Sequence, residues 1–284
     1  MRAIPITCAI ALALAIQASG QTAPPAGPPA DQLPLVKQIR KTVSFIDLVC
    51  ESGQTLHKVR GTGFFVWYPE QRASESAGFT YLVTNRHVAE CWDDETRRPM
   101  TVRSIGVRLN LKNGSSTVAP LMTRGNAPWI YPADDSVDLA ILPFRPGDTA
   151  DYKMIPLSDF VTDDVMSAQR ITEGSKIMLT GFFYQFPGEC RMQPIIREGV
   201  LAMMPDEEMV TTTGKPGKVY LGDVHIFGGN SGSPVFVDFG GMHGNMFSLG
   251  EDYRMLGVVS GLFYEDTEFR LSVTTTLKGY GSRE

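Results

Sequence analysis

The chain has 284 residues and a net charge of −5, and charged residues make up 20% of it. No block of Lys and Arg stands out along the sequence. The composition therefore argues against a protein that binds nucleic acid or an anionic membrane surface.

The first residues read as a targeting segment. Arg2 gives a positive start, Ile4–Ile16 is mostly apolar, and small residues follow at Ala18–Gly20. This order predicts a signal peptide over residues 1–20. The apolar run is too short to span a bilayer, so a retained membrane anchor is the less favoured alternative. We expect export to the periplasm or beyond, without stable membrane association after the signal is cleaved.

A flexible linker is predicted over residues 21–34, which contain five prolines and no apolar pattern that could form a core. About 250 residues remain, from 35 to 284, which suits two small barrels that act as one domain. The split between them is expected near residues 150–165.

Short apolar runs rich in Val, Ile, Phe, Tyr and Thr follow one another, separated by Gly, Pro, Asn and Asp. About twelve such strands predict an all-β sandwich or barrel. One short helix is expected within Leu33–Thr42. The expected strands are Val43–Val49, Gly63–Tyr68, Tyr81–Thr84, Ser104–Leu111, Thr117–Met122, Leu139–Phe144, Lys176–Phe182, Pro194–Met203, Val219–Ile226, Pro234–Phe239, Leu256–Leu262 and Phe269–Thr275.

Three residues suggest a hydrolytic site. A short apolar strand runs into His87, Asp138 opens another strand, and Ser231 lies in the glycine-rich turn Gly228–Pro234. Each residue taken alone is more often structural. Their joint occurrence in the order His, Asp, Ser predicts a catalytic unit. The α/β-hydrolase elbow would need the order Ser, Asp, His and a glycine where Ser233 stands.

The chemistry explains why these residue types occur together. A serine hydroxyl is a weak nucleophile, so a histidine must take its proton. A buried carboxylate then holds the histidine tautomer and stabilises the imidazolium. Backbone N–H groups must face the developing oxyanion, and a glycine allows the required turn. The candidate oxyanion hole is formed by the N–H groups of Gly229 and Ser231.

Five motifs together resemble the bacterial members of the trypsin-like peptidase superfamily. The resemblance spans roughly Val43 to Thr275 and implies two six-stranded antiparallel β-barrels with the active site in the cleft between them. It also implies a serine endopeptidase that works through an acyl-enzyme. The motifs are Gly61–Val66, Thr84–Val88, Asp138–Leu142, Gly229–Pro234 and Leu256–Gly261.

One departure from the family concerns activation. Secreted animal relatives carry an Asp just before the nucleophile, and this Asp pairs with a newly cut amino terminus. Here Asn230 stands in that place. Since a neutral side chain cannot form the ion pair, we expect a site that needs no inserted N-terminus.

The resemblance also assigns residues around the substrate. It places His225 at the base of the pocket for the substrate side chain, with Ile226, Ser260, Gly261 and Leu262 beside it. No Asp lies at the base, so a preference for Arg or Lys is disfavoured. We expect a small or medium apolar P1 residue. The alternative is an acidic residue bound by protonated His225.

Cys8 lies in the signal, so Cys50, Cys91 and Cys190 allow one bridge and one free thiol. Because relatives often bridge a Cys just after the catalytic His to the preceding strand, the resemblance implies a Cys50–Cys91 disulfide. Free thiols are the alternative. No CxxC pair is present, which disfavours a zinc ribbon.

No cofactor or metal is expected. A metal hydrolase built on His57, His87, His225 and His243 lacks the i, i+4 spacing of a helical zinc site. The expected partners are protein or peptide substrates. Because only nine residues follow the last expected strand, no PDZ or other partner domain is expected.

The main functional alternative is a catalytically silent binding or sensor protein of the cell envelope on a protease fold. The intact set of His87, Asp138 and Ser231 argues for activity instead. One of two long loops, Glu70–Ala77 or Gly240–Tyr253, is expected to control access to the site.

Overall fold

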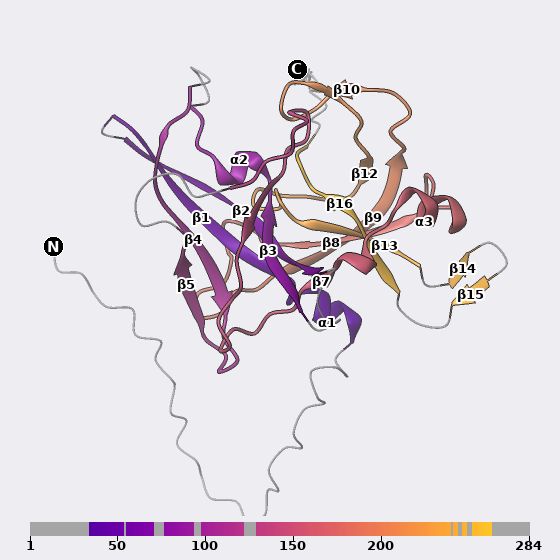
Figure 1. The fold of residues 1–284 in the computed structure, drawn as a ribbon, viewed down its shortest axis with the longest axis horizontal. Coiled ribbons are helices and arrows are strands. Elements are labelled where there is room, and N and C mark those ends of the chain that lie inside the picture. Colours follow the sequence, from indigo (N-terminus) through magenta and orange to yellow (C-terminus); the bar gives the residue numbers. More distant parts are fainter. Residues whose placement is uncertain are drawn as a thin grey trace, which may run out of the picture.

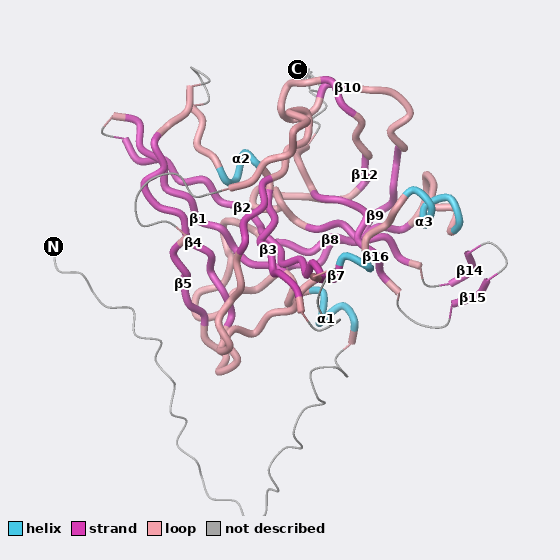
Figure 2. Tube along the Cα trace, viewed as in Figure 1, coloured by secondary structure: helices cyan, strands magenta, loops and turns pink. Residues whose placement is uncertain are grey.

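The computed structural model describes residues 34–53, 55–70, 77–93, 98–121, 129–239, 241–243, 246–248 and 252–262. The expected signal peptide (1–20), nearly all of the expected linker (21–34) and the expected strand Phe269–Thr275 lie outside these residues. Strands dominate the described part, and its few helices are short (Figure 2).

The first sheet comes from the N-terminal half of the described chain, coloured indigo to magenta in Figure 1. A short β7 (Ile155–Pro156) pairs in parallel with its strand β2. The other strands are antiparallel and lie in the order β5 (Ser116–Pro120), β4 (Thr101–Asn110), β1 (Val43–Ser52), β2 (Thr55–Pro69), β3 (Gly78–Thr84) and β6 (Ala140–Pro143).

The second sheet comes from the C-terminal half and lies beside the first (Figure 1). Its order is β12 (Leu221–Asp223), β9 (Ile195–Met203), β8 (Lys176–Gly181), β13 (Pro234–Asp238) and β16 (Tyr253–Val258). Two small hairpins accompany it, β10 (Met209–Val210) with β11 (Pro216–Gly217) and β14 (Gly241–His243) with β15 (Met246–Ser248).

The helical segments connect or flank the strands. They are α1 (Leu35–Ile39), α2 (Arg86–Ala89), the 3-10 turn η2 (Leu157–Asp159) and α3 (Asp163–Ala168). Within the described residues, no helix has the length and apolar character needed to cross a membrane.

The predicted all-β fold with two β-barrels is confirmed. Seven strands form the first sheet, because β7 adds to the six antiparallel ones. Five strands form the second sheet within the described residues, and the expected sixth, Phe269–Thr275, lies outside them. The six antiparallel strands of the first barrel match the predicted number. The predicted number for the second barrel is not tested.

One buried cluster joins the two halves. Phe45 and Phe64 of the first sheet meet Met178, Phe182 and Phe236 of the second half, and all five are at most 3% exposed. The rings of Phe45 and Phe182 lie edge to face with centroids 5.5 Å apart. Burying large apolar side chains from both sheets in one cluster holds the halves together, at about 1.5–3 kcal/mol per side chain.

Most expected strands occur within a few residues of their expected bounds. The largest difference is β2, which begins at Thr55 although the apolar pattern starts at Gly63. Its first part is exposed, so no alternation of buried residues signals it. The expected helix is shorter than Leu33–Thr42 and occupies Leu35–Ile39. The loop expected over Gly240–Tyr253 contains the small β14–β15 hairpin.

Candidate active site

Strand register brings His87 and Asp138 together. Strand β3 pairs with β6 so that Thr84 lies opposite Ala140. Residue 86, two positions after Thr84 and at the start of the short helix α2, therefore comes beside Asp138, two positions before Ala140. The two side chains meet across a sequence separation of 51 residues because antiparallel neighbours run in opposite directions.

The contacts between this pair fix the imidazole. Asp138 Oδ2 lies 2.7 Å from His87 Nδ1, and Asp138 Oδ1 accepts from the His87 backbone N–H at 3.2 Å. A carboxylate only accepts hydrogen bonds, so Nδ1 is the donor, and in the neutral imidazole the lone pair is then on Nε2. The buried amide of Asn85 donates to the Asp138 carbonyl at 2.8 Å and holds the backbone of the acid in place.

Asp138 is charged although it is buried, with 5% of its side chain exposed against 44% for His87. Burial by itself favours the neutral acid, but the hydrogen bond and charge of His87 outweigh it. A hydrogen bond from Ser260 Oγ at 2.9 Å adds to them. Together they hold the pKa of Asp138 below its ordinary value.

Ser231 lies in a loop whose glycines adopt conformations that other residues avoid. Gly229 has φ of +99° and Gly232 has φ of +82°, in the left-handed region. A Cβ on Gly232 would collide with the carbonyl oxygen of Thr62. A Cβ on Gly229 would lie 2.7 Å from the carbonyl oxygen of Phe182. The glycines are therefore required both by backbone conformation and by close packing.

Thr62 on β2 ties this loop to the first sheet. Its N–H donates to the Ser231 carbonyl at 2.8 Å and its hydroxyl donates to the Gly229 carbonyl at 2.7 Å. The same hydroxyl accepts from the Phe182 N–H at 3.1 Å. Thr62 is fully buried. If its hydrogen bonds were removed, water could not replace them, and the backbone groups would be left without partners.

Asn230 holds the loop from inside. Its side-chain oxygen accepts from the Phe227 N–H at 2.9 Å, and its amide donates to the Phe182 carbonyl at 3.2 Å. The residue is 1% exposed. Both polar ends of the Asn230 side chain therefore form hydrogen bonds with neighbouring backbone groups. A neutral side chain can form these bonds, so the loop does not need an ion pair.

The candidate oxyanion donors are free to bind a substrate oxygen. Among the described residues, neither the Gly229 N–H nor the Ser231 N–H donates a hydrogen bond. The preceding carbonyl, that of Gly228, accepts from the Tyr184 N–H at 3.1 Å, which sets the plane of the peptide that carries the Gly229 N–H.

Ser231 and the His87 segment both pack closely against Gly61. A Cβ on Gly61 would lie 2.6 Å from a methyl of Val88 and 3.1 Å from the Ser231 carbonyl oxygen. Within the described residues, Ser231 Oγ and His87 make no hydrogen bond. Such bonds are often long in unliganded sites and tighten when substrate binds.

The residues expected around the substrate are placed less uniformly. His225, Gly261 and Leu262 are exposed, whereas Ile226 and Ser260 are half-buried. The chain before Ser260 runs beside the nucleophile loop, because the Gly232 N–H donates to the Val259 carbonyl at 2.9 Å. The side chain of Ser260, a residue expected beside the substrate, donates a hydrogen bond to Asp138 Oδ2 at 2.9 Å.

The cysteines are bridged. Cys50 on β1 and Cys91, just after α2, form a disulfide with their Cα atoms 5.8 Å apart. Cys190 is also disulfide-bonded, so no described cysteine carries the free thiol that the sequence count allows. The Cys50–Cys91 bridge anchors the end of the His87 segment to the first sheet.

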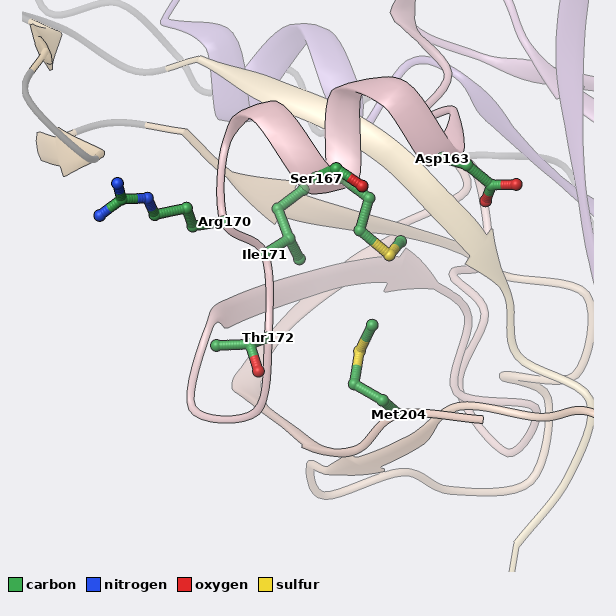
Figure 3. A pocket seen from close by; sticks show the side chains of 7 residues that line it. Asp163, Ser167, Arg170, Ile171, Thr172 and Met204 are labelled. Atoms are coloured by element: carbon green, nitrogen blue, oxygen red, sulfur yellow. The ribbon is translucent and has the colours of Figure 1, made fainter. Parts of the chain in front are cut away.

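No cluster of three or more His, Cys, Asp or Glu that could hold a metal occurs among the described residues. A surface pocket of about 430 Å³ beside α3 contains none of the expected site residues. Figure 3 shows it lined by Ile171 and Met204, with the charged ends of Asp163 and Arg170 pointing away. It is separate from the candidate active site.

A family comparison agrees with this geometry. The profile of the trypsin-like peptidase domain matches residues 61–243, which is more than half of the chain. The chain therefore belongs to the trypsin-like peptidase family and is a serine-type endopeptidase by class. No curated protein matches the chain with significance.

The solved structures that resemble this chain include Deg5 and an HtrA-type protease. Deg5 is 16% identical, with 78% of this chain and 86% of that chain covered and a TM-score of 0.45. The HtrA-type protease AlgW with a decapeptide is 14% identical, with 78% and 62% covered and a TM-score of 0.41. The same protease with a tripeptide is 15% identical, with 78% and 58% covered and a TM-score of 0.40. The chain spans less than two thirds of the AlgW chains.

Three residues at the site were missed by the sequence analysis. Asn85 lies within the His motif but was given no role, and Thr62 lies in the Gly61–Val66 motif without one. Thr212, whose hydroxyl lies 3.4 Å from Asp138 Oδ2, carries no sequence signal at all. The side chains at this site contact residues that are 22 to 167 positions away in the sequence. The pattern of neighbouring residues in the sequence cannot reveal such contacts.

Proposed function

We propose that this protein is an exported serine endopeptidase in which Ser231 is the nucleophile, His87 the base and Asp138 the residue that orients His87. The observation that carries the proposal is the His87–Asp138 contact at 2.7 Å beside a glycine loop that presents Ser231. The membership of the trypsin-like peptidase family supports it.

The reaction follows from the roles of these groups. Ser231 Oγ attacks the substrate carbonyl carbon while its proton passes to His87 Nε2. The carbonyl oxygen becomes negative and is stabilised by the N–H groups of Gly229 and Ser231. His87 then gives its proton to the departing amine as the C–N bond breaks, which leaves an acyl-enzyme. Water releases the acyl group by the same steps, with His87 again as base.

Asn230 supports a site that assembles without a cleaved amino terminus. In relatives with an Asp at this position, an ion pair with the new terminus orders the loop. Here the Asn230 side chain binds the Phe227 N–H and the Phe182 carbonyl within the same half of the molecule. Hydrogen bonds of a neutral side chain thus hold the loop in place, so activity should not depend on one defined N-terminal residue.

For specificity we propose a small or medium apolar P1 residue, in line with the absence of an acidic residue at the pocket base. One observation favours the acidic alternative. The guanidinium of Arg197 lies 4.5 Å from the ring centroid of Phe227, which is two residues after His225. Among the described residues Arg197 makes no ion pair, so its charge is available to an acidic side chain of the substrate. A peptide-library cleavage profile of the wild type and of Arg197→Gln separates the two. Arg197→Gln leaves an apolar preference unchanged and abolishes an acidic one.

The proposal is tested by labelling the mature chain with a fluorophosphonate probe and by measuring peptide cleavage. We expect labelling and cleavage in the wild type and loss of both in Ser231→Ala. The Ser233→Ala variant is the matched control, because Ser233 is a buried serine two residues away. A correctly folded wild type without labelling or cleavage would instead indicate the silent binding protein. Secretion of the full chain with cleavage near residue 20 tests the proposed export.

A further inference from the structure

The hairpin β10–β11 belongs to the second half of the chain but rests on the turn that precedes Asp138. A Cβ on Gly217 would lie 2.8 Å from Ser136 Oγ, so the hairpin backbone packs directly on this turn. At the tip, Lys215 Nζ lies 3.3 Å from a carboxylate oxygen of Asp135. The hairpin is thus docked against the segment that carries the acid.

One side chain of the hairpin reaches the acid itself. Thr212 Oγ1 lies 2.5 Å from Ser260 Oγ and 3.4 Å from Asp138 Oδ2. Ser260 Oγ in turn lies 2.9 Å from the same carboxylate oxygen. Two segments of the second half, carrying Thr212 and Ser260, therefore meet the first half at one oxygen atom, Asp138 Oδ2. The same oxygen atom also faces His87.

The directions of these hydrogen bonds follow from the number of protons. A carboxylate can only accept, so Ser260 gives its single hydroxyl proton to Asp138. The hydrogen bond between the two hydroxyls must then be donated by Thr212. This occupies a lone pair of Ser260 and holds its proton toward Asp138. A chain of two hydroxyls thereby ends on the carboxylate.

The segment that follows Ser260 leaves room for this contact. A Cβ on Gly261 would lie 2.5 Å from the Thr212 methyl group. Glycine at position 261 therefore lets the hairpin approach Ser260. Thr212 is exposed, whereas Asp138 is 8% exposed. The hydroxyl can be removed without opening the core.

From this geometry we propose that Thr212 is a positioning residue for catalysis, which acts through Ser260 to hold the Asp138 carboxylate against His87. The inference rests on the proposed function of His87, Asp138 and Ser231. It assigns the β10–β11 hairpin a part in the reaction, in addition to its part in the fold. Thr212 does not touch the reacting atoms in this account.

The test compares Thr212→Val, Thr212→Ser and Thr213→Val with the wild type, using a peptide substrate identified by cleavage profiling. Valine keeps the shape of threonine without its hydroxyl, and serine keeps the hydroxyl without the methyl. Thr213 is a matched control, since its hydroxyl lies 2.9 Å from that of Thr211 in the same hairpin and has no contact with Asp138. The thermal midpoint of each variant is measured alongside.

We expect Thr212→Val to lower kcat about 3- to 10-fold, the effect of one hydrogen bond on a barrier, with KM unchanged. Thr212→Ser should restore kcat, and all thermal midpoints should match the wild type. Equal losses in Thr212→Val and Thr213→Val, a change in KM alone, or failure of the serine variant to restore kcat would overturn the inference. A wild type that neither labels with fluorophosphonate nor cleaves would instead refute the proposed function on which it rests.

Discussion

The two ends of the candidate site are held by different means. At the acid end, Asp138 receives hydrogen bonds from the side chains of His87 and Ser260, and both His87 and Thr212 are exposed to solvent. At the nucleophile end, the loop around Ser231 is fixed by the buried side chains of Thr62 and Asn230. Changes at the acid end should therefore alter the reaction, whereas changes at the nucleophile end should alter both reaction and stability.

The largest effect is expected for Asp138→Asn at the acid end. The neutral amide no longer stabilises the imidazolium and can donate to Nδ1, which favours the wrong tautomer of His87. We expect kcat to fall about 10⁴-fold with little loss of stability. Steady-state kinetics and thermal unfolding measure the two effects. Asp134→Asn, on the same turn and exposed, is the control, and an equal loss there would contradict the assignment.

The disulfide gives a test confined to the His87 half. Cys50 and Cys91 are 41 residues apart, and loop-closure entropy predicts that replacing both with Ala lowers the free energy of unfolding by about 4 kcal/mol. Denaturant unfolding with and without reductant measures the change. We expect reductant to destabilise the wild type and to have a much smaller effect on the double variant.

Thr62→Val tests the nucleophile end. It leaves the Gly229 carbonyl and the Phe182 N–H without a buried partner, so we expect a loss of about 1–3 kcal/mol in unfolding free energy together with lower kcat. Thr80→Val is the control, because within the described part of the chain the buried Thr80 hydroxyl donates only to the weak acceptor Met154 Sδ, at 3.2 Å. Loss of activity without loss of stability would argue against the contrast between the two ends.

The smallest effect concerns Asp151, whose two ion pairs join the halves. Asp151 lies 2.7 Å from Lys41 and 2.6 Å from Arg191. Burial favours its neutral form, but hydrogen bonds from both cations lower its pKa. Because the folded pKa is depressed, the stabilisation is complete above the unfolded pKa of about 3.9 and is lost as pH falls through the folded pKa.

We expect these two ion pairs together to contribute about 1 kcal/mol near neutral pH, since their groups are partly exposed. Asp151→Asn should be destabilised by that amount at pH 7 and show a shallower loss of stability below about pH 4. Unfolding free energies of both proteins across this range measure it. Parallel pH curves for wild type and variant would show that the ion pairs do not contribute.

The sequence by itself determined the strands, the order His87, Asp138, Ser231 and the glycines of the nucleophile loop. These are local properties: alternation of buried residues marks a strand, and a left-handed turn requires glycine at Gly229 and Gly232. It also suggested that Asn230 removes the need for an inserted amino terminus. Residues 1–20 carry the predicted signal on their composition alone.

The tertiary structure decided which donors surround the acid and the nucleophile loop. Ser260 meets Asp138 across 122 positions, Thr212 across 74, and Thr62 meets Gly229 across 167. A hydroxyl gives the same sequence signal wherever it stands, so its partner is set only when the two sheets pack and the hairpin docks. For that reason the chemistry could be predicted from the chain, whereas the groups that hold it in place could not.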